Sequence, residues 1–142
     1  MMPDETDVFV GVPVTPGLAE GLALVTCERI AFNLGVDERT GTVIERGHEL
    51  ERQSLAGRIL VFPGCKGSTA SSYSLLQMAA LGVGPIALIS IQADALSAAG
   101  AVLADIPLVH RCNQDPLQVL KTGDWVRVDG HTGVVEWQRG GS

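Results

Sequence analysis

A short polar run between residues 64 and 72 contains the side chains of this sequence that are best suited to chemistry. It holds two glycines, one lysine and four hydroxyl residues: Gly64, Lys66, Gly67, Ser68, Thr69, Ser71 and Ser72. A serine or threonine hydroxyl becomes a base or a nucleophile only when its oxyanion is stabilised. Loop amides, the positive end of a helix and a lysine ammonium can each provide that stabilisation. We therefore expect this run either to bind an anion or to activate one of its hydroxyls.

The spacing within the run excludes several familiar sites. A nucleotide phosphate loop needs four residues between its glycines, whereas two residues separate Gly64 from Gly67, and the order Lys66-Gly67-Ser68 also differs from that motif. The dinucleotide-binding fingerprint and the Gly-x-Ser-x-Gly nucleophile elbow are absent. Two other interpretations stay open. In the first, Ser68 or Thr69 only caps a helix. In the second, Cys65 is a thiol that is activated at the start of a helix.

The residues around the run alternate between apolar strands and helical patterns. Strands are predicted over 58–62, 85–91 and 106–110, and helices over 71–81 and 94–104. Asp94 is expected to cap the second of these helices. Strands that alternate with helices in this way form a parallel sheet with crossover helices. The polar run thus lies where the first strand leads into the first helix.

The flanking segments are typical of additional β-strands. Short strands and a final hairpin are predicted over 8–12, 22–27, 43–44, 125–129 and 134–138. Residues 13–21 are expected to form turns, and a short helix should begin at Pro116. We therefore expect one α/β domain over residues 1–142. It should have a small parallel sheet, extra β-strands, and loose ends at 1–7 and 139–142.

Composition and charge exclude several classes of protein. The chain has 142 residues, 46% of them hydrophobic, which is enough for one buried core. The net charge is −6 and no basic patch occurs, so we expect no nucleic-acid partner. The three cysteines are widely spaced, which argues against a disulfide framework and against a metal site on this chain. No signal peptide or apolar run of about 20 residues is found, so we expect no membrane contact and a cytoplasmic location.

Several segments together resemble the small subunit, or swivel domain, of the aconitase X family. The resemblance covers most of the chain and rests on Pro16–Val25, Ile30–Asp37 with Thr40-Gly41, His48, Gly57–Ser72, Pro85–Ile89 and Gly100–Pro107. Two departures from the family pattern occur. Asn33 and Leu34 replace a Trp-Gly pair, and Lys66 stands where arginine is common.

The resemblance implies a fold, an activity and a partner. The fold would be the aconitase-like swivelling β/β/α domain. The activity would be that of a hydro-lyase, which removes water from a small hydroxy acid. The active site would lie between this domain and a large subunit that is similar to the body of aconitase. That large subunit, and not this chain, would hold an iron or iron–sulfur centre.

The resemblance also assigns roles within the polar run. By its position in the Gly-Ser motif, Ser68 matches the family's serine that acts as the base. Lys66, Gly67, Thr69 and Ser71 are then expected to bind the substrate or other negative charge, although Lys66 is equally compatible with a solvated loop lysine.

From this resemblance we expect cis-3-hydroxy-L-proline as the substrate. The alternatives are phosphomevalonate, or a non-catalytic interaction or small-molecule-binding module on the same fold. His48 is expected to be a surface or capping residue.

Overall fold

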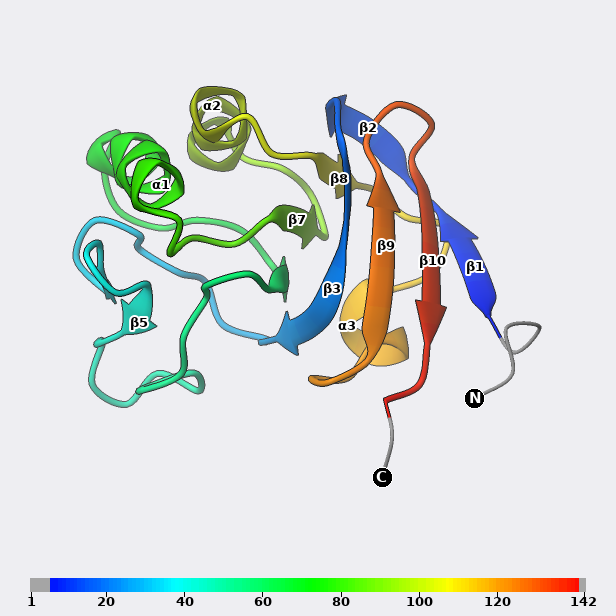
Figure 1. Cartoon of the computed structure of the whole chain (residues 1–142), viewed down its shortest axis with the longest axis horizontal. Coiled ribbons are helices and arrows are strands. Elements are labelled where there is room, and N and C mark those ends of the chain that lie inside the picture. Colours follow the sequence, from blue (N-terminus) through cyan, green and yellow to red (C-terminus); the bar gives the residue numbers. More distant parts are fainter. Residues whose placement is uncertain (1–5, 141–142) are drawn as a thin grey trace.

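The computed structural model describes residues 6–140 and combines one large sheet with three helices (Figure 1). The elements are β1 (Asp7–Val10), β2 (Val12–Thr15), β3 (Leu18–Val25), β4 (Val36–Asp37), β5 (Thr42–Val43), β6 (Ile59–Phe62), α1 (Ala70–Leu81), β7 (Ala87–Ser90), α2 (Ala95–Ala104), β8 (Leu108–His110), α3 (Pro116–Val119), β9 (Trp125–Asp129) and β10 (Val134–Gln138). Of the helices in this part of the chain, none has the length and apolarity needed to cross a membrane.

The centre of the large sheet is parallel, as the sequence predicted. Strands β3, β6, β7 and β8 are neighbours in that order, and each pair is parallel. Helix α1 connects β6 to β7, and α2 connects β7 to β8. The two helices pack against each other (Figure 1). The expectation of an α/β domain with crossover helices and additional strands is confirmed.

The alternating side chains of β6 divide the core into two halves. Leu60 and Phe62 belong to a cluster that also contains Leu75 and Met78 of α1, so this half lies beneath the helices. Ile59 and Val61 face the opposite half, which is built largely from valines of the antiparallel strands. All four residues of β6 are buried, as expected for a strand that is covered on both faces. The parallel half of the large sheet therefore lies between its antiparallel half and the helices α1 and α2, which gives two β layers and one helical layer.

The N-terminal segment closes the sheet, and here the sequence prediction needs correction. The strand expected over 8–12 is broken at Gly11: β1 pairs with β10 at one end of the sheet, and β2 pairs with β8 at the other. A Cβ on Gly11 would lie 2.6 Å from Val109 Cγ1, so only glycine fits at this bend. The turns expected over 13–21 are wrong, because most of this stretch is in β2 and β3.

The two chain ends are better ordered than expected where they are described. Asp7 is the first residue of β1 and pairs with Trp137. Arg139 forms an ion pair of 2.7 Å with the buried Asp124, and the Gly140 N–H donates to the same carboxylate. These pairings correct the expectation of loose ends at residues 7, 139 and 140. The rest of the expected loose ends, residues 1–5 and 141–142, lies outside the described residues.

Candidate functional site

The polar run leaves the carboxyl end of β6 and leads into α1. In open α/β sheets this edge is where ligands bind. The run is fixed to the rest of the fold through its backbone. The Lys66 N–H donates to the Ile30 carbonyl at 3.0 Å, and the Cys65 N–H donates to the Asp94 carboxylate at 2.8 Å. Gly67 has a φ of +102°, a conformation that favours glycine. Residues 66 to 70 are exposed, so the start of α1 is open to a ligand or a partner.

Ser68 is exposed, and its side-chain oxygen accepts two hydrogen bonds. The donors are the Ala70 backbone N–H and the Asn33 side-chain amide, each at 3.3 Å. Thr69 already has helical dihedrals and makes no side-chain cap bond, so Ser68 is the residue that caps α1. The capping interpretation therefore holds for Ser68. The same two donors also face the atom that would carry negative charge if the hydroxyl lost its proton.

The start of α1 offers further unpaired N–H groups. Within residues 6–140, the backbone N–H groups of Gly67, Ser68 and Thr69 donate to no other group. The first turn of α1 contains no acidic side chain that would offset its positive end. Ser71 is placed differently from these three residues. It is buried, its N–H donates to the Ser68 carbonyl, and its hydroxyl donates to Asn33 Oδ1 at 2.9 Å.

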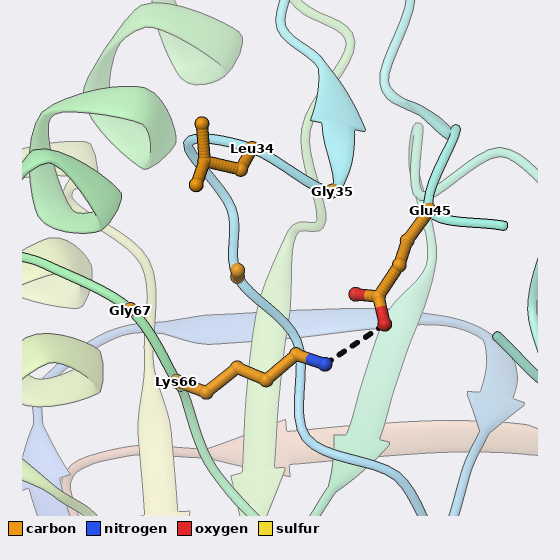
Figure 2. A pocket seen from close by; sticks show the side chains of 6 residues that line it. Leu34, Gly35, Glu45, Lys66 and Gly67 are labelled. Carbon is orange, nitrogen blue, oxygen red and sulfur yellow. Dashed lines mark hydrogen bonds and ion pairs between the residues drawn. The ribbon is translucent and has the colours of Figure 1, made fainter.

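The Lys66 side chain forms an ion pair in the isolated chain. Its Nζ lies 2.8 Å from Oε2 of Glu45, on the wall of a pocket of about 350 Å³ (Figure 2). The pocket is lined by Ala31, Leu34, Gly35, Glu45, Lys66 and Gly67. The side chains of the ion pair are 45% and 31% exposed, and such surface pairs contribute less than about 1 kcal/mol. An anion beside the loop can therefore compete with Glu45 for the Lys66 ammonium.

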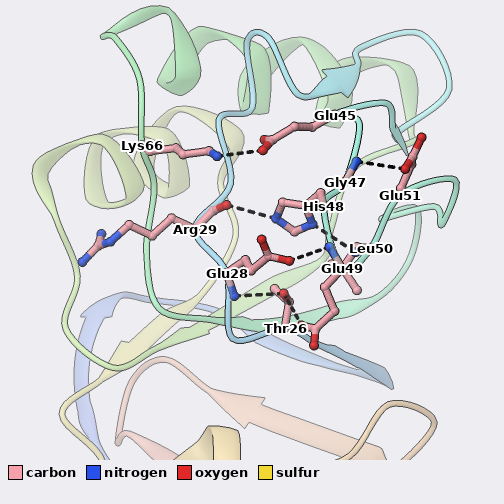
Figure 3. A network of polar contacts seen from close by, with 10 residues as sticks. All are labelled: Thr26, Glu28, Arg29, Glu45, Gly47, His48, Glu49, Leu50, Glu51 and Lys66. Carbon is pink, nitrogen blue, oxygen red and sulfur yellow. Dashed lines mark hydrogen bonds and ion pairs between the residues drawn. The ribbon is translucent and has the colours of Figure 1, made fainter.

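A network of polar contacts holds the segments next to this pocket (Figure 3). His48 is 5% exposed, so the expectation of a surface position is wrong. Its Nδ1 accepts from the Leu50 N–H, and its Nε2 lies 3.0 Å from the Arg29 carbonyl. Both bonds form when the ring is neutral and carries its proton on Nε2. His48 thus joins the chain around 29 to the chain around 50 and takes a structural role.

The remaining candidates for chemistry on this chain are structural. Cys65 is buried, and burial raises the pKa of its thiol to about 12, so the structure argues against an activated thiol at this position. Asp94 caps α2 as predicted, through a bond from the Ser97 N–H. In the part of the chain that the structure describes, no three His, Cys, Asp or Glu side chains are grouped so that they could hold a metal ion.

Asn33 is the site residue that sequence reasoning missed. It lies in the turn before β4, where its side chain reaches Ser68 on one side and Ser71 on the other. The only signal in the sequence was that Asn33 and Leu34 depart from the family pattern at this turn. No local pattern places residue 33 beside residue 68, because the contact depends on how the two segments meet at the sheet edge.

Comparisons with known proteins agree with this architecture. Residues 8–137 match the family described as "Aconitase X swivel domain". The phosphomevalonate dehydratase small subunit of Methanocella arvoryzae is 46% identical over 89% of this chain and 96% of its own length. The protein of the same name from Methanothrix thermoacetophila is 47% identical over 86% of this chain and 88% of its own length.

A solved structure shows the same fold. It is a chain from the crystal structure of Thermococcus kodakaraensis aconitase X in its holo form. The two chains superpose with a TM-score of 0.87 and 38% sequence identity, over 94% of this chain and 99% of that one. The β/β/α swivel fold expected from the sequence is therefore confirmed, and the chain belongs to the aconitase X swivel domain family.

Proposed function

We propose that this chain is the small subunit of a phosphomevalonate dehydratase and that Ser68 is its base. The observation that carries the proposal is the exposed Ser68 Oγ with two N–H donors directed at it. The names of the two curated relatives support the substrate. Those names do not support cis-3-hydroxy-L-proline, the substrate that we expected from the sequence. They agree with phosphomevalonate, the alternative that the resemblance implied.

The proposed chemistry is a proton abstraction followed by loss of water. Ser68 Oγ, in its alkoxide form, takes a proton from the carbon next to the substrate carboxylate. The electron pair of that C–H bond forms the new carbon–carbon double bond. The C–O bond on the adjacent carbon breaks, its electron pair goes to the departing oxygen, and the hydroxide becomes water when it gains a proton. The backbone N–H of Ala70 stabilises the alkoxide before the proton is taken.

The substrate phosphate has a suitable place beside the same loop. The N–H groups of Gly67, Ser68 and Thr69 have no partner within residues 6–140, and the start of α1 is positively polarised. Lys66 can add an ammonium when it leaves Glu45. Ser71 supports the loop from within the core, because its hydroxyl donates a hydrogen bond to Asn33 Oδ1. A phosphate at this position would accept hydrogen bonds that the chain itself leaves unused.

The large subunit would complete the site. The described part of this chain has no group of side chains suited to a metal, so an iron or iron–sulfur centre would have to be held by that partner. Such a centre would supply the Lewis acidity that helps the hydroxyl to leave. Residues 66 to 70 are exposed in this chain, so a second chain could cover them.

The test is a dehydration assay on the complex of this chain with its large subunit. Ser68→Ala should leave the complex assembled but lower kcat at least about 1,000-fold, because the base is lost. Ser54→Ala is a matched control: Ser54 also accepts a bond from the backbone N–H two residues on, at 3.1 Å, and it lies outside the loop. It should retain full activity.

Two outcomes would contradict the proposal. Nearly full activity of Ser68→Ala would remove Ser68 as the base. Failure of the chain to join any large subunit, together with phosphate binding by the chain alone, would favour the binding module instead. Assaying hydroxyproline isomers beside phosphomevalonate tests the choice of substrate in the same experiment.

A further inference from the structure

We propose that Asn33 is a second catalytic residue, which donates a hydrogen bond to Ser68 Oγ and so stabilises the base in its alkoxide form. This inference rests on the proposed role of Ser68. Asn33 Nδ2 lies 3.3 Å from Ser68 Oγ, on a segment that joins the loop only in the folded chain. An amide N–H that points at an oxygen stabilises negative charge on it, as an oxyanion-hole donor does.

The orientation of the Asn33 amide is fixed by Ser71. The Ser71 hydroxyl lies 2.9 Å from Asn33 Oδ1, and its other acceptor, the Lys66 carbonyl, is farther away at 3.4 Å. With the amide oxygen accepting from Ser71, the amide nitrogen faces Ser68. The reversed amide would present an oxygen to Ser68, which could then only keep the proton on the serine hydroxyl. Ser71 is therefore a positioning residue that acts through Asn33.

The residues around the Asn33 amide are compatible with its hydrogen bonds to Ser71 and Ser68. Ser71 is fully buried, so its hydroxyl has no water to replace Asn33 as a partner. Gly67 lies directly beside the amide, and a Cβ at this position would be 3.2 Å from Asn33 Oδ1. The glycine thus allows Asn33 to approach the loop closely. Gly67 and Ser71 thus both lie against the Asn33 amide, which donates to Ser68 Oγ.

The direct test is Asn33→Asp in the complex with the large subunit. Aspartate keeps the shape and the acceptor for Ser71, but it replaces the donor to Ser68 with a negatively charged oxygen. We expect kcat to fall about 10- to 100-fold with little change in KM, because one donor to the oxyanion is lost. The rising limb of the pH–rate profile should move to higher pH, since the alkoxide is harder to form. Asn113→Asp is the control, because within residues 6–140 the Asn113 side chain bonds only through its oxygen, which accepts from the Val10 N–H.

A second pair of variants separates positioning from stability. Ser71→Ala removes the hydroxyl that orients the amide, whereas Ser72→Ala removes a hydroxyl of the same helical turn that bonds to the Leu96 carbonyl at 2.9 Å. Both should destabilise the fold to a similar extent. Only Ser71→Ala should lower kcat, by about 3- to 10-fold, and shift the pH profile in the same direction as Asn33→Asp.

A readout that does not depend on activity completes the test. The side-chain amide signals of Asn33, identified by their loss in Asn33→Asp, should shift in the NMR spectrum of the full chain when either Ser68 or Ser71 becomes alanine. They should stay in place in Ser72→Ala.

The outcomes separate this inference from the proposed function. If Ser68→Ala is inactive while Asn33→Asp keeps wild-type kcat and pH profile, Asn33 has no catalytic role and Ser68 remains the base. If the Asn33 amide signals do not shift in Ser68→Ala or Ser71→Ala, the contact of Asn33 with these two serines is contradicted. If Ser68→Ala is active, the proposed function fails, and the role of Asn33 fails with it.

Discussion

The carboxylate of Asp94 joins the start of α2 to the candidate loop through the backbone N–H of Cys65, at 2.8 Å. The same side chain accepts bonds from the N–H and the hydroxyl of Ser97, at 2.8 and 3.0 Å, and so caps α2. Gly64 is needed for this approach, because a Cβ there would lie 2.6 Å from Asp94 Oδ2. One carboxylate therefore fixes both a helix end and the stretch of backbone that leads to Ser68.

Replacement of Asp94 should destabilise the fold and loosen the loop together. Asp94→Ala removes a helix cap and leaves the Cys65 N–H without its acceptor, for a combined cost of about 2–3 kcal/mol in the free energy of unfolding. Hydrogen exchange at the Cys65 amide should become faster. The control is Asp115→Ala, since Asp115 caps α3 through the Leu117 N–H and does not contact the loop. Equal exchange rates at Cys65 in the two variants would contradict the link between α2 and the loop.

Gly67→Ala should harm activity more than stability. The φ of +102° at Gly67 disfavours any side chain, and the added methyl group would also press on Asn33 Oδ1 from 3.2 Å. Gly57→Ala is the matched control, with a φ of +70° and no atom within 4 Å of the added Cβ. Both variants should lose about 1 kcal/mol of unfolding free energy. Only Gly67→Ala should lower kcat, by about tenfold or more. Equal kcat values in the two variants would show that the close approach at Gly67 is unimportant.

The prediction from sequence succeeded where the signal was local. Apolar periodicity located α1 and α2, and the last two strands have the predicted bounds. It failed at Pro13 and at Glu20-Gly21, which are typical of turns, because β2 and β3 depend on pairing with β8 and β9 far along the chain. The same limit explains Asn33. It meets Ser68 across 35 positions of sequence, and only the packed fold brings the two residues together.

The stability contributed by Glu49 should depend on pH. A hydrogen bond from the Thr26 hydroxyl (Figure 3) holds the pKa of Glu49 below its ordinary value of 4.5, together with a second bond from the Cys27 N–H. A carboxylate with a lowered pKa stabilises the fold above its unfolded pKa, and this contribution is lost as pH falls through the folded pKa. Glu49→Gln should thus be less stable than wild type at neutral pH, by under about 1 kcal/mol because the group is exposed.

The difference between wild type and Glu49→Gln should shrink as the medium is acidified below 4.5, which chemical denaturation at a series of pH values can measure. Glu136→Gln is a suitable control, because the Glu136 side chain makes no hydrogen bond within residues 6–140. A difference that stays constant down to low pH would show that the Thr26 contact does not depend on the charge of Glu49.

The three thiols should differ sharply in reactivity. Cys27 is exposed, whereas burial raises the pKa of Cys65 to about 12 and that of Cys112 to about 11. Only the thiolate reacts with a disulfide reagent, so near neutral pH the native chain should label quickly at Cys27 alone. All three should label in denaturant. Cys27→Ser should abolish the fast phase of labelling. Fast labelling of Cys65 in that variant would instead support an activated thiol at Cys65, which the structure argues against.

Loss of the Lys66 charge should weaken substrate binding more than it slows the chemical step. If the Lys66 ammonium leaves Glu45 for the substrate phosphate, Lys66→Gln removes a charged hydrogen bond that is worth about 1.5–3 kcal/mol. KM for phosphomevalonate should then rise at least about tenfold, with a smaller change in kcat. Lys121→Gln makes the same change of charge at an exposed lysine outside the loop, and its KM should match wild type. Because the interaction is electrostatic, added salt should raise KM for wild type and have less effect on Lys66→Gln. An unchanged KM in Lys66→Gln would instead make this residue a solvated loop lysine that only pairs with Glu45, and the phosphate would then depend on the backbone N–H groups of the loop alone.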